Sequence, residues 1–189
     1  MTTRTIEGQA LDIGWARDDR WDISVDDYLE MATHKTAYYS VAVPLVCGAI
    51  IGGGTDEQVE ALRAFGISAG LAFQLQDDLL NLVGEQEATQ KDFRSDITEG
   101  KRTMLVVHAL GDPAVSGELK AILDTHTDDP ASLARAVELL EQAGSIDYVR
   151  SYSLDLVRRA KELLEPIPLE EAPKQLLFSM ADFFVQRLV

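Results

Sequence analysis

The chain has 189 residues, 46% of them hydrophobic and 26% charged, a balance typical of one folded globular domain. Its formal net charge of -15 would repel nucleic acid and anionic membranes, so we expect neither as a partner. With Cys47 as the single cysteine, an intramolecular disulfide and a thiolate metal site are excluded. The N-terminus lacks a signal-peptide pattern, and the longest apolar run, 41–54, is too short for a bilayer. We therefore expect a cytoplasmic protein that is not an integral membrane protein.

Helical periodicity runs through almost the whole chain, and no alternating strand pattern interrupts it. The sequence therefore predicts an all-α protein with a single helical domain over residues 1–189. Residues 8–13 look like the middle of a helix, which suggests that structure is missing upstream. A helix that begins at Ser24 is expected to bend at Pro44 and to end at the glycine cluster 52–54.

A second helical series follows that glycine cluster. Thr55 and Gln58 form the pattern of a capping box, which predicts a long helix from there to about Val83. A polar loop over 84–100 separates this helix from the rest of the chain. Its composition and the glycines and prolines beyond it predict further helices at 101–110, 115–124, 131–143, 145–164 and 174–189.

A polar stripe marks the end of the long helix. Gln74, Asp77, Asp78 and Asn81 fall at positions i, i+3, i+4 and i+7, so they share one helix face. The surrounding residues are nearly all apolar, the reverse of an ordinary surface helix. The stripe is therefore predicted to face a cavity on a helix that is otherwise buried.

Two adjacent carboxylates on a buried helix repel each other unless a cation compensates them. Oxygen ligands without thiolates favour a hard ion, and magnesium shared with substrate phosphates fits best. The simpler interpretation is that Asp77 and Asp78 are surface charges facing solvent. Lys91 and Lys101 in and after the polar loop would add cations beside the carboxylates, in an arrangement suited to a diphosphate, although either lysine alone would be an ordinary surface residue.

Together these residues resemble the C-terminal half of the trans-isoprenyl diphosphate synthases, the polyprenyl synthetase family. The resemblance implies an all-α fold, a partial isoprenoid-synthase helical bundle lacking the N-terminal helices. The matching elements, in chain order, are Gly8-Gln9-x-x-Asp12, Tyr28-Leu29, Lys35-Thr36, Phe73-Gln74-x-x-Asp77-Asp78, Lys91, Ser95-Asp96-Ile97, Glu99-Gly100-Lys101-Arg102-Thr103 and Ala181-Asp182-Phe183-Phe184-Val185-x-Arg187.

The chain departs from the family pattern in two places. The second aspartate-rich motif, D-D-x-x-D in the family, ends here in Asn81, which keeps an oxygen acceptor but loses the charge. The first aspartate-rich motif, which lies upstream of the Gly8-Gln9 element in the family, is absent from the sequence.

The resemblance implies a magnesium-dependent, head-to-tail condensation of isopentenyl diphosphate with an allylic diphosphate, of the geranylgeranyl or polyprenyl type. The implied roles are metal binding by Asp77 and Asp78, diphosphate binding by Lys35, Lys91 and Lys101, and catalysis by Lys35, Thr36 and Gln74.

Three interpretations of the whole chain stay open. It is the catalytic C-terminal half of a synthase, acting as a homodimer or as a heterodimer with a chain that carries the first aspartate-rich motif. Alternatively, it is a non-catalytic small subunit that binds and regulates a full-length synthase. A class I terpene cyclase fragment, which also uses acidic helices and magnesium, ranks last because Lys35-Thr36 and Gly100-Lys101-Arg102 resemble the synthases more.

Overall fold

The computed structural model describes residues 1–84 and 94–187, and within them every regular element is a helix. The all-α class predicted from the sequence is therefore confirmed. The chain forms two compact units, and the prediction of a single domain stays a prediction. Unit 1 comprises residues 1–9, 30–76 and 152–187, and unit 2 comprises 10–29 and 77–151. None of the described helices combines the length and apolarity needed to cross a bilayer.

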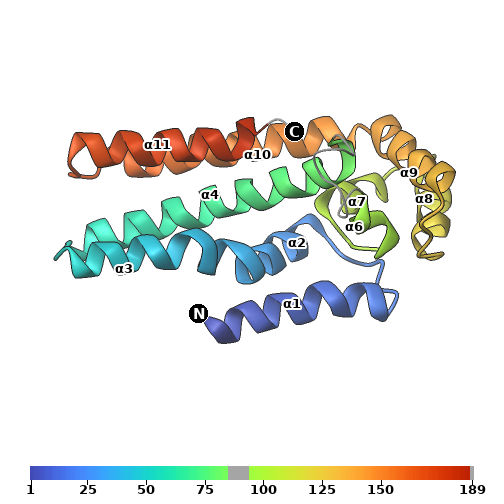
Figure 1. Cartoon of the computed structure of the whole chain (residues 1–189), viewed down its shortest axis with the longest axis horizontal. Coiled ribbons are helices and arrows are strands. Elements are labelled where there is room, and N and C mark those ends of the chain that lie inside the picture. The colour runs from blue at the N-terminus through green and yellow to red at the C-terminus, as the bar shows by residue number, and fades with distance from the viewer. Residues whose placement is uncertain (85–93, 188–189) are drawn as a thin grey trace. The chain divides into compact units, whose positions relative to one another are not determined.

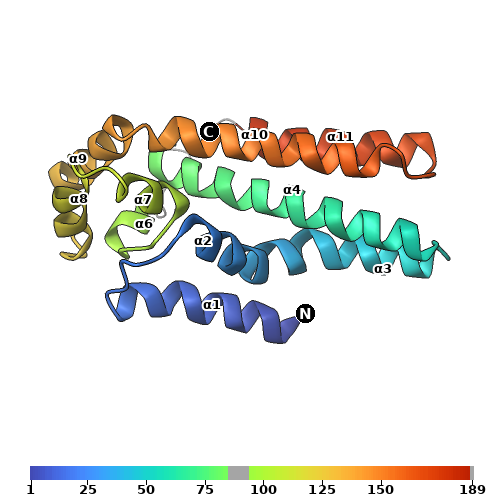
Figure 2. The same cartoon turned by 180° about the vertical axis from the view of Figure 1, so that it is seen from behind.

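Unit 1 is built from long helices that lie lengthwise beside one another (Figures 1 and 2). Its elements are the first half of α1 (Thr2–Arg17), η1 (Thr33–Ala42), α3 (Val43–Ile51), most of α4 (Asp56–Val83), the second half of α10 (Ser145–Leu164) and α11 (Glu171–Gln186). Both small and large apolar side chains are buried between these helices, including Ala37, Phe65, Ala72 and Leu75. Close packing of this kind supplies most of the stability of such helices.

The capping box predicted at the start of α4 is confirmed. The Thr55 amide donates to Gln58 Oε1 at 2.9 Å, and the Gln58 amide donates to Thr55 Oγ1 at 3.3 Å. The side-chain nitrogen of the same glutamine, Nε2, donates to the backbone carbonyl of Pro168 at 2.6 Å. One side chain therefore both starts α4 and ties it to the connection between α10 and α11.

A π-helix, η1, interrupts the helical run that begins with α2 (Val25–Ala32). Its wider turn is packed against glycines: a Cβ at Gly66 would lie 2.5 Å from Ala42 Cα, and one at Gly70 would lie 2.7 Å from Ala37 Cα. Pro44, where the sequence predicts a bend, stands in the first turn of α3 directly after this segment. The change of hydrogen-bond register and the proline therefore coincide.

Unit 2 groups short helices around its own apolar core. It contains the second half of α1, most of α2, the end of α4, the start of α10, and the helices α6 (Ser95–Thr98), α7 (Met104–Ala109), α8 (Ser116–Leu123) and α9 (Pro130–Gln142). Helix α9 packs against α6, α7 and α8, as both views show (Figures 1 and 2). Its core side chains, each at most 2% exposed, include Leu105, Leu119, Leu123, Leu139, Leu140 and Val149.

Two predicted helix starts are corrected by the structure. The helix predicted at 101–110 begins at Met104, because the Thr103 hydroxyl caps it by accepting from the Val106 amide. The helix predicted from Lys174 begins at Glu171, since Pro173 lies in its first turn, where the missing amide hydrogen is not needed.

Candidate functional site

In unit 1, Thr36 and Gln74 form a direct hydrogen bond. The Thr36 hydroxyl, on η1, donates to Gln74 Oε1, on α4, at 2.6 Å, and Thr36 is 7% exposed. These two predicted site residues are 38 positions apart in the chain, and the packing of η1 against α4 brings them together. The bond fixes both side chains relative to each other.

Lys35 neighbours this pair on the same π-helix and is half-buried. Its backbone is closely packed: a Cβ at Gly8 in α1 would lie 2.8 Å from Lys35 Cα. This distance is much shorter than a van der Waals contact, so the position has no room for a residue larger than glycine. The glycine of the Gly8-Gln9 element therefore allows α1 to reach the backbone that carries Lys35.

In unit 2, the paired carboxylates lie in the last two turns of α4. Asp77 is half-buried, while Asp78 is 7% exposed and accepts a 2.6 Å hydrogen bond from the hydroxyl of Tyr28. Burial raises the pKa of the Tyr28 phenol well above its ordinary value, and the charges of Asp78, Asp96 and Asp12 raise it further. Tyr28 is therefore protonated and acts as a donor.

Asn81, where the family pattern has aspartate, binds the segment that begins α6. Its side-chain nitrogen donates to Ser95 Oγ at 2.9 Å, and its side-chain oxygen accepts from the Asp96 amide at 3.2 Å. Its backbone carbonyl accepts from the Arg94 amide at 2.8 Å. Since an amide both donates and accepts, this arrangement uses the property that distinguishes asparagine from aspartate.

Lys101 forms ion pairs with two carboxylates. Its Nζ lies 2.7 Å from Asp96 Oδ1 and 3.0 Å from Glu99 Oε2. Burial alone would lower the pKa of Lys101, but the charge and hydrogen bond of Asp96, aided by Glu99, raise it. For Asp96, burial raises the pKa against the opposing effect of Lys101. The lysine is therefore positively charged, and its two ion pairs hold it in the loop between α6 and α7.

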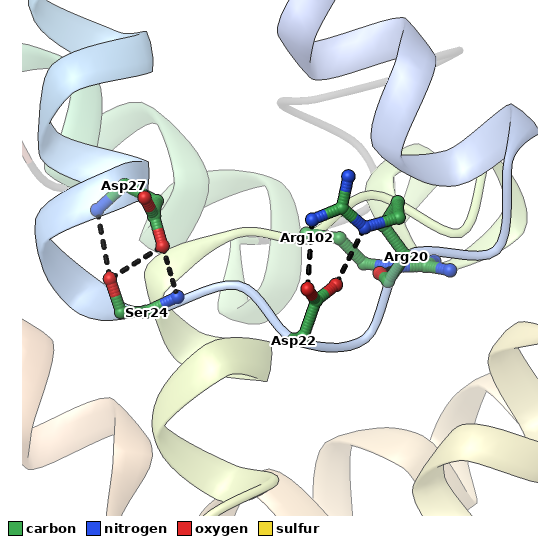
Figure 3. A network of polar contacts seen from close by, with 5 residues as sticks. All are labelled: Arg20, Asp22, Ser24, Asp27 and Arg102. Atoms are coloured by element: carbon green, nitrogen blue, oxygen red, sulfur yellow. Dashed lines mark hydrogen bonds and ion pairs between the residues drawn. The ribbon is translucent and has the colours of Figure 1, made fainter.

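Arg102 anchors the linker between α1 and α2 to this loop (Figure 3). It is 3% exposed, its Nε donates to the Arg20 carbonyl at 2.8 Å, and another guanidinium nitrogen donates to the Gly100 carbonyl. The guanidinium carbon lies 3.5 Å from the centre of the Trp21 ring. A cation on an indole face is attracted by the ring quadrupole, so the contact with Arg102 holds Trp21, and with it the linker, in place.

The same linker ends in the predicted helix start at Ser24, which is confirmed. The Ser24 hydroxyl accepts from the Asp27 amide at 3.1 Å, and Asp27 accepts from the Ser24 amide and hydroxyl at 2.8 and 2.6 Å (Figure 3). Arg20 and Asp22 form a two-bond ion pair just before it, at 2.6 and 2.8 Å. These contacts set the start of α2, and so the position of Tyr28 one turn later.

The predicted site residues thus fall into two groups. Unit 1 holds Lys35, Thr36 and Gln74, with the last two in contact, and unit 2 holds Asp77, Asp78 and Lys101. Lys91 lies outside the described residues.

Sequence reasoning did not assign a role to Tyr28 or Asp12, which is 7% exposed and contributes to the electrostatics around Tyr28. The match of Asp12 to the Gly8-Gln9-x-x-Asp12 element is a signal that could have identified it. The pairing of Tyr28 with Asp78 had no such signal, because the two residues lie 50 positions apart in the chain.

The donor chemistry of Asp77 and Asp78 fits a hard divalent cation. Over residues 1–84 and 94–187, no cluster of three or more His, Cys, Asp or Glu side chains could hold a metal ion by itself. Magnesium, however, keeps several waters and is usually bound through one or two carboxylates plus substrate phosphates. A carboxylate pair without further acidic ligands matches that mode of binding.

Comparison with known proteins gives a consistent family match. The family model described as "Polyprenyl synthetase" matches residues 1–140. A geranylfarnesyl diphosphate synthase of Natronomonas pharaonis is 43% identical over 187 residues, covering 98% of this chain and 52% of that protein. A short chain isoprenyl diphosphate synthase of Methanothermobacter thermautotrophicus is 39% identical over 181 residues, covering 96% of this chain and 54% of that protein. The chain therefore spans about half the length of the curated relatives it matches.

Solved structures agree with this match. A geranylgeranyl pyrophosphate synthase from Corynebacterium glutamicum, complexed with isoprenyl diphosphate and magnesium, superimposes with a TM-score of 0.91 at 31% identity. The match covers 99% of this chain and 53% of that one. The partial isoprenoid-synthase bundle predicted from the sequence is confirmed.

Proposed function

Since the chain belongs to the polyprenyl synthetase family, we propose that it forms the C-terminal part of an isoprenyl diphosphate synthase. The proposed reaction is the head-to-tail condensation of isopentenyl diphosphate with an allylic diphosphate to a product of the geranylgeranyl or polyprenyl type. The proposal includes a cytoplasmic location and a dimer, either of two such chains or with a chain that carries the first aspartate-rich motif.

The observation that carries this proposal is the Asp77-Asp78 pair at the end of α4. Asp78 is 7% exposed and hydrogen-bonded, so the pair is not an ordinary set of solvated surface charges. An anionic chain needs local cations to bind an anionic substrate, and this pair would recruit one. Magnesium bound here would neutralise charge on the diphosphate and so help it to leave.

The lysines and the Thr36-Gln74 pair supply the remaining functions. Lys35 and Lys101, with Lys91, bind the diphosphate oxygens through charge-assisted hydrogen bonds. For Lys101 this means that the phosphate replaces the exposed Glu99 as its partner, while Asp96 keeps the side chain in place. Thr36 and Gln74 hold oxygen dipoles near the developing allylic cation, and their mutual hydrogen bond fixes those dipoles in advance.

A second candidate function is that of a non-catalytic small subunit that regulates a full-length synthase. The observation that favours it is the engagement of Asn81 with Ser95 and Asp96, since this residue serves local structure where the family has a carboxylate. The two functions differ in their need for Asp77, which only the catalytic one requires.

The test is a turnover assay with magnesium, labelled isopentenyl diphosphate and three allylic diphosphates of increasing length. Asp77→Ala in the active assembly is expected to lower the rate by at least about a hundredfold, because it removes a direct metal ligand. Asp147→Ala is the matched control, since this aspartate is exposed and forms an ion pair with Arg150, three residues further along the same helix. A normal rate for Asp77→Ala would exclude the catalytic function and leave the regulatory one.

A further inference from the structure

We propose that Tyr28 is a positioning residue for the metal–diphosphate site: its buried hydroxyl fixes the Asp78 carboxylate and thereby the geometry in which the Asp77-Asp78 pair receives magnesium diphosphate. The inference rests on the proposed function and adds to it a residue from a different helix. Asp77 keeps the role of direct ligand that the proposed function gives it, and the Tyr28 hydroxyl orients Asp78 beside it.

The contact has the geometry of a strong hydrogen bond. The Tyr28 hydroxyl lies 2.6 Å from Asp78 Oδ2, the tyrosine is 1% exposed, and the aspartate is 7% exposed. A hydroxyl bound to a carboxylate at this separation is charge-assisted and about twice as strong as a neutral pair. The bond joins α2 to α4 near the end of α4, since this helix ends at Val83, less than two turns after Asp78.

Helix ends fray, so carboxylates so close to an end need a fixed neighbour to keep one orientation. Tyr28 is such a neighbour, because it is buried in the core of unit 2 and directly follows the Ser24-Asp27 capping box that begins α2. The phenol hydroxyl is the donor of this bond, since an ionised carboxylate can only accept.

A neutral donor is well suited to this position. It satisfies one oxygen of Asp78 without competing with a cation for the negative charge, as a lysine or arginine would. Outer partners of this kind orient metal-binding carboxylates, and their removal typically weakens metal binding by about 10- to 100-fold.

The experiment measures binding of labelled inorganic pyrophosphate to the purified chain by equilibrium dialysis while magnesium is varied. Tyr28→Phe removes the hydroxyl and keeps the ring in the core. The expected result is a rise of about tenfold in the magnesium concentration for half-maximal binding. The amount of pyrophosphate bound at saturating magnesium stays the same, which a general loss of structure would not allow. Tyr148→Phe is the matched control in unit 2, since its ring stacks on His108 at 4.1 Å.

An unchanged magnesium midpoint in Tyr28→Phe, with normal binding by the parent chain, would overturn the positioning role and leave the proposed function standing. If the parent chain shows no magnesium-dependent binding, or Asp77→Ala leaves it intact, both fail. Should Tyr28→Phe lose helical circular dichroism, Asp78→Asn is the second variant, because its amide oxygen can still accept from the Tyr28 hydroxyl but the charge that strengthens the bond is gone. It is expected to raise the magnesium midpoint similarly, and a midpoint equal to that of the parent chain would overturn the inference.

Discussion

The hydrogen bond between Thr36 and Gln74 makes a testable contribution to stability. Thr36→Val keeps the branched shape but leaves Gln74 Oε1 without the donor that lies at 2.6 Å. The free energy of unfolding is expected to fall by about 1 kcal/mol, measured by urea denaturation. Thr36→Ser keeps the hydroxyl and is expected to retain most of this stability, so equal losses in both variants would show that the hydrogen bond is not the cause.

At the scale of single residues, the sequence indicates which side chains carry chemistry but not how they are paired. Asp77 and Asp78 stand out because acidic residues are unusual on a helix that is otherwise apolar. Their partner Tyr28 does not stand out, because a tyrosine among apolar residues is normally part of a core. The role of Asn81 was also beyond prediction, since its hydrogen bonds to Ser95 and Asp96 depend on how the chain turns after α4.

Among the elements, the contact between η1 and α4 depends on glycine. Gly66→Ala would place a methyl group 2.5 Å from Ala42 Cα, a distance that only backbone movement can relieve. The expected loss in unfolding free energy is about 2 kcal/mol, from thermal or urea unfolding.

Gly48→Ala in α3 is the control, because nothing lies within 4 Å of the added methyl group. Alanine favours helix over glycine, so this variant is expected to be as stable as the parent chain or more stable by up to about 1 kcal/mol. A loss of stability in Gly48→Ala as large as that in Gly66→Ala would refute the packing argument.

The same contact shows what could be predicted for the elements. Helix α4 was predicted to within a residue because local signals define it, namely the capping box at Thr55 and a long apolar period. The π-helix was not predicted, because it packs against glycines that are distant in sequence, namely Gly8 of α1 and Gly66 and Gly70 of α4. For α7, the polar residues Lys101 and Arg102 look helical in sequence but are held outside the helix by Asp96 and the Arg20 carbonyl.

At the scale of the whole molecule, the exposed apolar face of α11 has a consequence for association. Leu176, Met180 and Phe183 on α11 are 62, 45 and 62% exposed and lie at positions i, i+4 and i+7. Apolar faces of this kind favour association. We expect the purified chain to self-associate with rising concentration, as measured by sedimentation velocity.

The variant Leu176→Ser with Phe183→Ser is expected to reduce this association. Ile51→Ser is the comparison, since Ile51 is even more exposed, at 87%, but lies on α3 and is not part of the face of α11. Equal effects of the two variants would show that association depends on total apolar exposure and not on the face of α11.

The burial of Arg102 also changes how the chain meets a protease. Lys101 and Arg102 are consecutive basic residues, a pair that trypsin normally cleaves, yet Arg102 is 3% exposed beneath Trp21 and bound to the Arg20 carbonyl. Cleavage after Arg102 therefore requires the linker between α1 and α2 to lift away. The rate of that cut, relative to cuts at exposed basic residues, reports how often this opening occurs in the folded chain.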